Sequence, residues 1–277
     1  MSAARFLPAA LAFGPLIWAE GSGTREAPSY SAASIVNAAS NVAGSLAPYM
    51  VATIYGAGLA HSTRALRPED IRANALPRML DGVRVFVNNT QAELYFVSPS
   101  QINFVVPHEA GPNPNDTTPV PWPMDVTVWT EVDGVMGPKA TVKLREAAPG
   151  LFQQDAGTVI ATHADWSLIT TARPARPGED IVLFATGLGR TAPPVRQQQL
   201  PQGAASIEKQ QQFQVWLAGQ PLDAGRVAYV GITPGYAGLY QINLRLPEKL
   251  ESDPEVRISV AGETSPAGLR LPCTPGN

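Results

Sequence analysis

The side chains that most often carry out chemistry in proteins are few and scattered in this sequence. The histidines are His61, His108 and His163, and none of them has the His-x-x-x-His or His-x-x-Glu-His spacing that binds one zinc ion. Cys273 is the only cysteine, so no cysteine pair can hold a metal or form an intrachain disulfide. The Gly-x-Ser-x-Gly turn of many hydrolases is also missing. The sequence therefore predicts neither a metal nor a cofactor.

Carboxylates offer another route to chemistry, because paired acids hydrolyse glycosidic bonds and clustered acids bind calcium. The candidates are single acids on predicted strands and turns: Asp125, Glu131, Asp133, Asp155 and Asp165. Acids in such places are usually solvated or form turns. We therefore predict a protein that is not an enzyme. The alternative is a hydrolase with its site in a cleft between two domains or in a loop predicted at 225–239.

Three aromatic residues are better candidates for a functional site. Phe86 and Trp216 occupy matching positions in two similar segments, on the face opposite the apolar residues that would form the core. Trp129 lies on the corresponding face of its own segment. Rings presented on a sheet face stack on sugars or anchor a protein partner, so we expect a surface glycan or a protein as the partner. The alternative is that each ring packs beneath a loop or against another domain.

These positions match because much of the chain is repeated. Segment 46–59 returns at 175–188, and Gln101-Ile-Asn-Phe-Val-Val-Pro107 returns as Gln241-Ile-Asn-Leu-Arg-Leu-Pro247. Each copy is about 115 to 130 residues long, which is the length of a domain. The offset between the copies grows from 129 at Gly58/Gly187 to 140 at Gln101/Gln241. The second copy therefore contains an insertion, which we predict in the loop at 225–239.

Each copy keeps a glycine and a pair of amides to which we assign structural roles. Gly58 and Gly187 follow an apolar strand and precede a leucine, where a positive φ angle is expected. In Gln101-Ile-Asn103 and Gln241-Ile-Asn243 the two amides share the face opposite the isoleucine. We expect the glutamines to bind backbone groups of a neighbouring loop and to fix the strand register. The alternative is that these amides face a ligand.

Short segments with alternating apolar residues make up most of the chain. Val83–Val87, Val126–Thr130 and Val256–Val260 are typical of half-buried strands. One helical turn is predicted near 67–75. The pattern predicts an all-β protein of two tandem immunoglobulin-like antiparallel β-sandwich domains. We place these domains at 34–146 and 147–273, followed by a tail at 274–277, because Pro149 and Gly150 interrupt the strand pattern.

Charge and the N-terminal segment indicate where the protein acts. The net charge is −3 and Lys and Arg form no run, so we expect no nucleic-acid partner. Arg5 precedes an apolar stretch that ends at Ala19, which is typical of a signal peptide at 1–19 followed by a leader at 20–33. No other segment has the apolar length of a membrane span. We expect an extracellular or cell-surface protein that starts near Glu20, with Cys273 as an incidental cysteine or, alternatively, a reactive or intermolecularly paired thiol.

Several short motifs, taken in order, resemble one known family. They are Val36–Ser40, Tyr55–Leu59, Val97–Pro107, Ala147–Phe152, Ala185–Gly189 and Pro234–Asn243. The series resembles the Solibacter-type C-terminal domain family of acidobacterial secreted proteins, which is similar to the immunoglobulin-like IPT/TIG sandwiches. The resemblance covers about residues 34–272 and implies this fold and export, without any catalytic residue.

The combined prediction is a secreted, non-enzymatic adhesion, matrix or carbohydrate-contacting module. A secreted hydrolase and a purely structural spacer are the alternatives.

Overall fold

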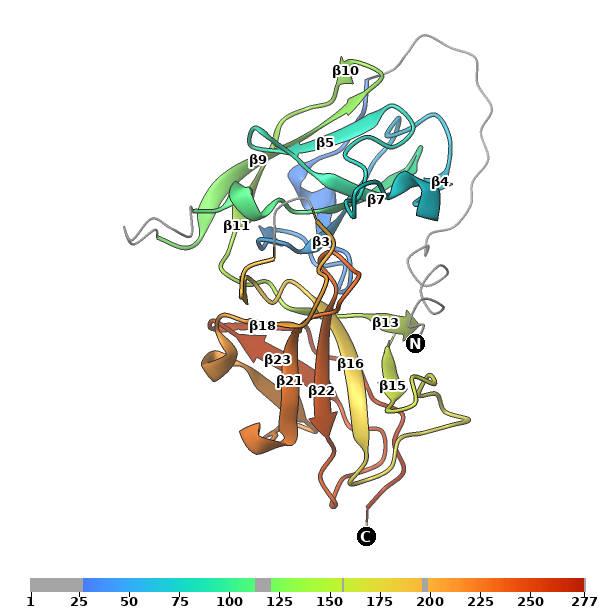
Figure 1. The fold of residues 1–277 in the computed structure, drawn as a ribbon, viewed down its shortest axis with the longest axis vertical. Helices are drawn as coiled ribbons and strands as arrows, with labels where there is room; N and C mark the ends of the chain where they lie inside the picture. The colour runs from blue at the N-terminus through green and yellow to red at the C-terminus, as the bar shows by residue number, and fades with distance from the viewer. Residues whose placement is uncertain (1–26, 113–120, 156, 196–198, 277) are drawn as a thin grey trace.

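The structure is a computed structural model that describes residues 27–112, 121–155, 157–195 and 199–276 (Figure 1). The predicted signal peptide at 1–19 and the first part of the leader lie outside the described residues. Within them strands dominate, and the helical elements are short 3-10 turns: η1 (Ala32–Ser34), η2 (Pro68–Asp70), η3 (His108–Ala110), η4 (Gln210–Gln212) and η5 (Ala224–Arg226). Turn η2 falls in the predicted helical turn, and the all-β class is confirmed.

The N-terminal half, which we define as the described residues up to 146, has two antiparallel sheets and lies at the top of Figure 1. One sheet has the order β1 (Ile35–Asn37), β3 (Val51–Tyr55), β8 (Gln101–Val105), β7 (Glu93–Ser98) and β4 (Arg64–Ala65). The other has the order β2 (Ser45–Leu46), β11 (Ala140–Leu144), β9 (Met124–Val132), β5 (Val83–Val87) and β6 (Thr90–Gln91), and β10 (Val135–Met136) pairs with β9. Only β2 runs parallel to its neighbour, β11.

The C-terminal half, from residue 147, is built in the same way. Its larger sheet has the order β12 (Gly150–Leu151), β16 (Asp180–Thr186), β22 (Tyr240–Arg245), β21 (Val227–Ile232), β18 (Ala205–Ile207) and β17 (Thr191–Ala192), and β15 (Ala161–His163) also pairs with β16. The smaller sheet has the order β20 (Gln220–Pro221), β19 (Gln214–Leu217), β23 (Val256–Val260) and β24 (Glu263–Thr264). A short pair, β13 (Gln153–Asp155) and β14 (Thr158–Val159), completes it.

Strand pairing shows the repeat residue by residue. In the N-terminal half β3 pairs with β8 so that Tyr55 lies opposite Gln101. In the C-terminal half β16 pairs with β22 so that Phe184 lies opposite Gln241. The register also shifts at equivalent places in both halves, between Leu94 and Phe96 in β7 and between Val227 and Tyr229 in β21. The two copies therefore share their hydrogen-bond register and an irregularity in it.

The loop that we predicted for the insertion in the second copy is shorter than the sequence predicts. Strand β21 occupies 227–232, so the expectation of a loop throughout 225–239 is wrong. Strands β7 and β8 are joined by Pro99 and Ser100, whereas β21 and β22 are joined by 233–239. Gly231 misled the prediction because glycine usually marks a turn. In the strand its lack of a side chain is required instead, since a Cβ atom would lie 2.2 Å from the Ala205 carbonyl oxygen.

Apolar side chains form one large core in each half, and a smaller cluster joins Ala39 to residues of the C-terminal half. Residues from both sheets of the N-terminal half build the first cluster, and those of the C-terminal half build the second. Tyr49, Leu76 and Val105 of the N-terminal half pack into the second cluster. The division into domains at 146/147 stays a prediction, and the structure adds that the halves share buried contacts.

The end of the predicted leader and the region of Cys273 are both part of the folded structure. Ser29, in the predicted leader, exchanges two backbone hydrogen bonds with Ala57, and the Tyr30 hydroxyl donates to the Pro138 carbonyl over 2.6 Å. Cys273 is buried and pairs with Ala175, as Leu144 pairs with Leu46 in the first copy. Burial, and then the charges of Asp253 and Glu179, raise the pKa of its thiol to about 11. Such a thiol lacks the thiolate form that reactivity needs.

Candidate functional site

The structure brings two of the predicted aromatic residues together. Phe86 and Trp129 lie opposite one another on β5 and β9, and their rings stack with centroids 3.9 Å apart and planes 6° from parallel. The Lys139 ammonium lies 5.9 Å from the Trp129 ring centroid, and the indole nitrogen donates to the Asn88 carbonyl. Both rings are half-buried. Because Phe86 covers one face of the indole, a sugar cannot stack on that face without separating the pair.

Trp216, the third predicted aromatic residue, lies in the other half. Its side chain is half-buried on β19, opposite Arg257 of β23 and Pro221 of β20. The indole nitrogen donates to the Ser259 hydroxyl over 3.3 Å. Position 216 corresponds to Phe86, but the stack is not repeated because the residue facing it is arginine instead of tryptophan. A binding role for Phe86, Trp129 and Trp216 stays a prediction.

The repeated amides form hydrogen bonds within their own strands. The Gln101 side chain donates to the Asn103 side-chain oxygen over 2.9 Å, and Gln241 donates to Asn243 over 3.2 Å. We expected backbone groups of a neighbouring loop, and that expectation is wrong. The partner lies two positions along the strand because side chains i and i+2 share one face. In the first copy Thr53 also donates to Asn103, whereas valine occupies the equivalent position 182.

The repeated glycines have the backbone conformation that the sequence predicts. Their φ angles are +65° at Gly58 and +77° at Gly187. At Gly187 a Cβ atom would also lie 2.1 Å from the Ala148 carbonyl oxygen, and its own carbonyl accepts a hydrogen bond from the Ala148 amide over 2.8 Å. Gly187 thus allows the segment that joins the two halves to approach β16 closely.

A tryptophan that sequence reasoning missed is the most exposed aromatic side chain of the described residues. Trp166 is 49% exposed and Leu168, two positions on, is 43% exposed. They belong to a hairpin in which β15 pairs with 167–169, through hydrogen bonds from the His163 amide to the Ser167 carbonyl and from the Ile169 amide to the Ala161 carbonyl. Ile169 is fully buried and anchors the returning arm. The exposed indole is therefore carried by a hairpin fixed to the core.

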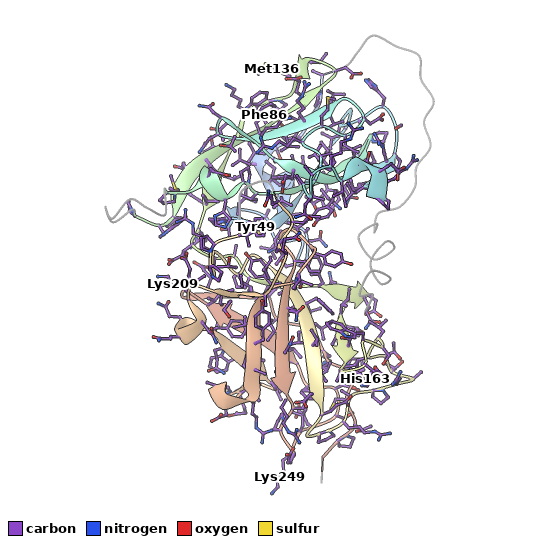
Figure 2. The ribbon with its side chains drawn as sticks, viewed as in Figure 1. Tyr49, Phe86, Met136, His163, Lys209 and Lys249 are labelled. Carbon is purple, nitrogen blue, oxygen red and sulfur yellow. The ribbon has the colours of Figure 1, made fainter. Side chains whose placement is uncertain are left out.

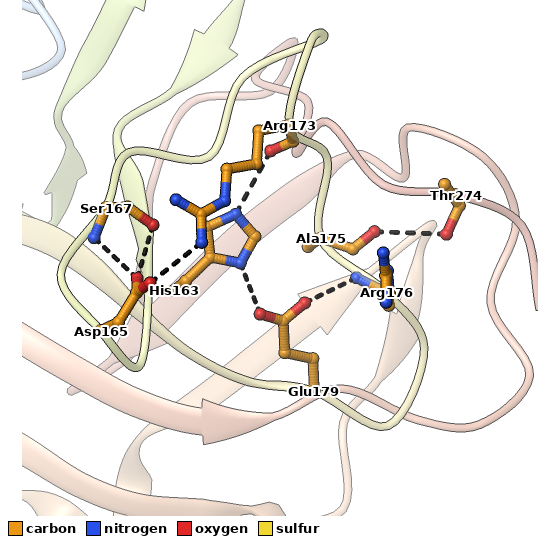
Figure 3. Close-up of polar contacts among 8 residues, drawn as sticks. All are labelled: His163, Asp165, Ser167, Arg173, Ala175, Arg176, Glu179 and Thr274. Atoms are coloured by element: carbon orange, nitrogen blue, oxygen red, sulfur yellow. Dashed lines mark hydrogen bonds and ion pairs between the residues drawn. The ribbon is translucent and has the colours of Figure 1, made fainter.

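Polar contacts hold the tip of this hairpin (Figure 3). The Asp165 carboxylate accepts hydrogen bonds from the Ser167 amide over 3.0 Å and from the Ser167 hydroxyl over 2.5 Å. Its other oxygen accepts from the Arg173 guanidinium over 2.9 Å. These hydrogen bonds, first from Ser167 and then from Arg173, hold the pKa of Asp165 well below its usual range. The carboxylate is therefore ionised, and can accept these hydrogen bonds, at the pH values at which proteins usually work.

Beneath the tip, His163 joins the hairpin to the start of β16. Its Nδ1 lies 2.5 Å from the Glu179 carboxylate, and its Nε2 lies 3.3 Å from the Arg173 carbonyl. The second Glu179 oxygen accepts from the Arg176 amide over 2.9 Å. Figure 3 shows these residues around the imidazole, and Figure 2 places His163 at one side of the lower half. His163 and Glu179 therefore connect the hairpin that carries Trp166 to the start of β16.

This arrangement does not form a Ser-His-Asp triad. A His–carboxylate pair can orient a general base, but the other His163 nitrogen faces a backbone carbonyl instead of a hydroxyl. Ser167, the nearest serine in the sequence, has its hydroxyl bound to Asp165. The acids considered in the sequence are engaged separately: Asp125 with Lys143, Glu131 with Arg84, and Asp133 with His61. Within the described ranges, no three His, Cys, Asp or Glu side chains are grouped to hold a metal ion.

Comparisons with known proteins concern the fold alone. No protein-family model and no curated protein matches the chain. It is similar to a surface glycan-binding protein from Prevotella bryantii, with 11% identity, a TM-score of 0.24, and coverage of 90% of this chain and 42% of that one. A Bacteroides ovatus surface glycan-binding protein, in complex with a mixed-linkage heptasaccharide, is similar with 13% identity and a TM-score of 0.30, over 83% of this chain and 42% of that one. Tandem immunoglobulin repeats of Dlar are similar with 13% identity and a TM-score of 0.21, over 83% of this chain and 92% of that one.

The chain thus spans less than half the length of the two glycan-binding proteins. Among the described residues, no helix has the length and apolar character that crossing a membrane requires.

Proposed function

We propose that this protein is a non-catalytic, carbohydrate-contacting module that acts outside the cell, and that Trp166 is its principal contact. The main support for this proposal is that Trp166 is 49% exposed and that its backbone φ angle is +67°. A bulky residue in this conformation is strained, at a cost of about 1–3 kcal/mol, and glycine or asparagine would suit the turn better. Neither packing nor turn preference therefore accounts for a tryptophan at this position, which leaves recognition.

The surroundings of the indole favour a sugar over a protein partner. In this hairpin the large exposed apolar side chains are Trp166 and Leu168. The other large exposed apolar side chains of the described residues, Val42, Met79 and Met136, lie elsewhere in the chain. A stable protein interface usually buries more than about 1,000 Å², with an apolar centre. Trp166 lies between Asp165 and Ser167 in the sequence, and Asp165 binds Arg173; a single ring with such polar neighbours suits a pyranose instead. The apolar face of a sugar covers the indole, and its hydroxyl groups meet the charged border.

The test is affinity electrophoresis of the mature chain in gels that contain soluble β-glucan, xylan, galactomannan or pectin. At least one polysaccharide is expected to retard the wild type, and Trp166→Ala to migrate as in a gel without polysaccharide. Met136→Ala is the matched control, because Met136 is 53% exposed in the other half. Equal retardation of Trp166→Ala and the wild type would overturn the role of Trp166. No retardation in any of the four gels would count against carbohydrate contact.

Export is part of the same proposal and has its own test. A polysaccharide outside the cell is reached only if the segment at 1–19 directs secretion, as its apolar pattern predicts. N-terminal sequencing of exported material is expected to give a start near Glu20. An intact Met1 on cytoplasmic protein would contradict it. Membership of the Solibacter-type family, with its implied export, belongs to this proposal too.

A further inference from the structure

Unpaired buried polar atoms concentrate where the two halves meet. Nearly all such atoms in folded proteins have a hydrogen-bond partner, so each exception needs an explanation. In the described residues the unpaired side-chain atoms include Tyr49 OH, Glu93 Oε1, His108 Nε2 and Arg190 Nε. Figure 2 shows Tyr49 at the junction of the upper and lower halves. His108 and Glu93 come from the N-terminal half, and Arg190 comes from the C-terminal half.

These four side chains are neighbours. The Tyr49 and His108 rings have centroids 5.5 Å apart. Burial, and after it the charge of Arg190, lower the pKa of His108 to about 4. Burial and then the charge of Glu93 raise the pKa of Tyr49 well above its usual value. Arg190 also crosses the junction, because its guanidinium donates to the Pro112 carbonyl. The group is therefore continuous from Glu93 through Tyr49 and His108 to Arg190.

The charges in this group favour an anion. Within the part of the chain that the structure describes, the Arg190 guanidinium has no carboxylate within 4.0 Å, although enclosed charges are normally paired. Burial raises the pKa of Glu93 to about 7, against the lowering effect of Arg78, so this carboxyl is often protonated near neutral pH. Of the other titratable groups, Glu109 acts on Glu93, whereas Tyr95 and Tyr240 interact with Tyr49. Tyr236 and Glu208 act in turn on Tyr95 and Tyr240.

We propose that the junction binds one small oxyanion, of the carboxylate or sulfate type, through Arg190 Nε, His108 Nε2 and Tyr49 OH. Arg190 supplies the positive charge and each of the three atoms can donate a hydrogen bond. The anion would give partners to atoms that lack them and would join the two halves. Its negative charge favours the protonated forms of the adjacent Glu93 and His108. Binding is therefore coupled to proton uptake and weakens as pH rises.

The test measures thermal unfolding and calorimetric binding with sodium sulfate and sodium acetate, against sodium chloride at equal ionic strength. At pH 6 at least one oxyanion is expected to raise the melting temperature in a saturable way that chloride does not reproduce. At pH 8 the affinity is expected to be weaker, by up to about tenfold per pH unit for each proton taken up. A wild type without a saturable response would show that water alone solvates these atoms, and would overturn the proposal.

Variants assign the response to the junction. Arg190→Met is expected to abolish it. Arg226→Met is the matched control, because Arg226 also donates from a partly buried side chain to a carbonyl, that of Leu246 over 2.8 Å. If Arg190→Met does not fold, Tyr49→Phe removes one donor with little change in volume and is expected to weaken binding several-fold. Equal loss in Arg226→Met, or an unchanged response in both junction variants, would refute the assignment. Trp166→Ala should keep the response, which separates this site from the carbohydrate contact.

Discussion

At the scale of single residues, Trp166 has a conformation that stability alone would not select. Replacing it by glycine removes the strain of a positive φ angle, and the indole that is lost is half in solvent already. We expect Trp166→Gly to have an unchanged free energy of unfolding or to gain up to about 1 kcal/mol, in urea denaturation. Trp216→Gly, in a strand with a half-buried indole, is the contrasting variant and should lose stability. A loss in Trp166→Gly as large as in Trp216→Gly would mean that Trp166 packs instead of binding.

Glu93 and His108 should make opposing contributions to the pH dependence of stability. The folded-state pKa of Glu93, about 7, lies above the ordinary 4.5, so its contribution to the free energy of unfolding is present at low pH and is lost as pH rises from about 4.5 to about 7. The folded-state pKa of His108, about 4, lies below 6.5, so its contribution is lost as pH falls from about 6.5 to about 4. The two effects partly cancel in the wild type.

Single variants should reveal each contribution. Relative to the wild type, Glu93→Gln is expected to become more stable as pH rises from 4.5 to 7, and His108→Gln as pH falls from 6.5 to 4. Urea denaturation at four pH values between 4 and 7.5 measures both differences. Differences that do not change with pH would show that these two groups titrate normally in the folded protein.

At the scale of elements, the stacked pair on β5 and β9 should act as a unit. Phe86→Leu, Trp129→Leu and the double variant form a double-mutant cycle, for which we expect a coupling free energy of about 0.5–1.5 kcal/mol. Phe86 and Trp216 lie in different halves and should be additive within about 0.5 kcal/mol. Measured by urea denaturation, a coupling near zero for the stacked pair would contradict the structural role that the stacking assigns to it.

The strand character of the chain was largely predictable because turns and alternation are local signals. The positive φ angles of Gly58 and Gly187 and the shared face of each Gln-Ile-Asn motif follow from residue types and the two-residue period of a strand. The glutamine partners were not predictable, because an amide can bond along its own strand as well as across to a loop. Strand β21 was missed because Gly231 serves close packing there and not a turn.

The site was less predictable than the fold. Phe86 and Trp129 were placed on the correct face, but no local signal shows that cross-strand neighbours will stack on each other. Trp166 was missed because it lies in no alternating segment, and alternation was the pattern used to select aromatic residues. The available signal was Asp165-Trp-Ser167, where an aspartate that can close a turn precedes a large aromatic residue.

At the scale of the whole molecule, Thr186 links the halves. Its hydroxyl accepts from the Val51 amide over 2.9 Å and donates to the Gly238 carbonyl over 2.7 Å, and all three groups are buried. Thr186→Val keeps the shape but leaves the amide and the carbonyl unpaired, which should cost about 1–3 kcal/mol per group in urea denaturation. Thr186→Ser keeps the hydroxyl and should lose much less. Equal stability of the valine and serine variants would show that this link does not stabilise the protein.

The central claim is that the indole of Trp166 contacts carbohydrate, and its solvent accessibility tests this most directly. Acrylamide quenching of tryptophan fluorescence is measured for the wild type and Trp166→Phe, with and without the polysaccharide that retards the wild type. Because Trp166 is the most exposed indole described, the wild type should show extra quenchable emission over Trp166→Phe. We predict that saturating polysaccharide removes this extra emission. Extra emission that persists while the polysaccharide is bound would contradict the claim.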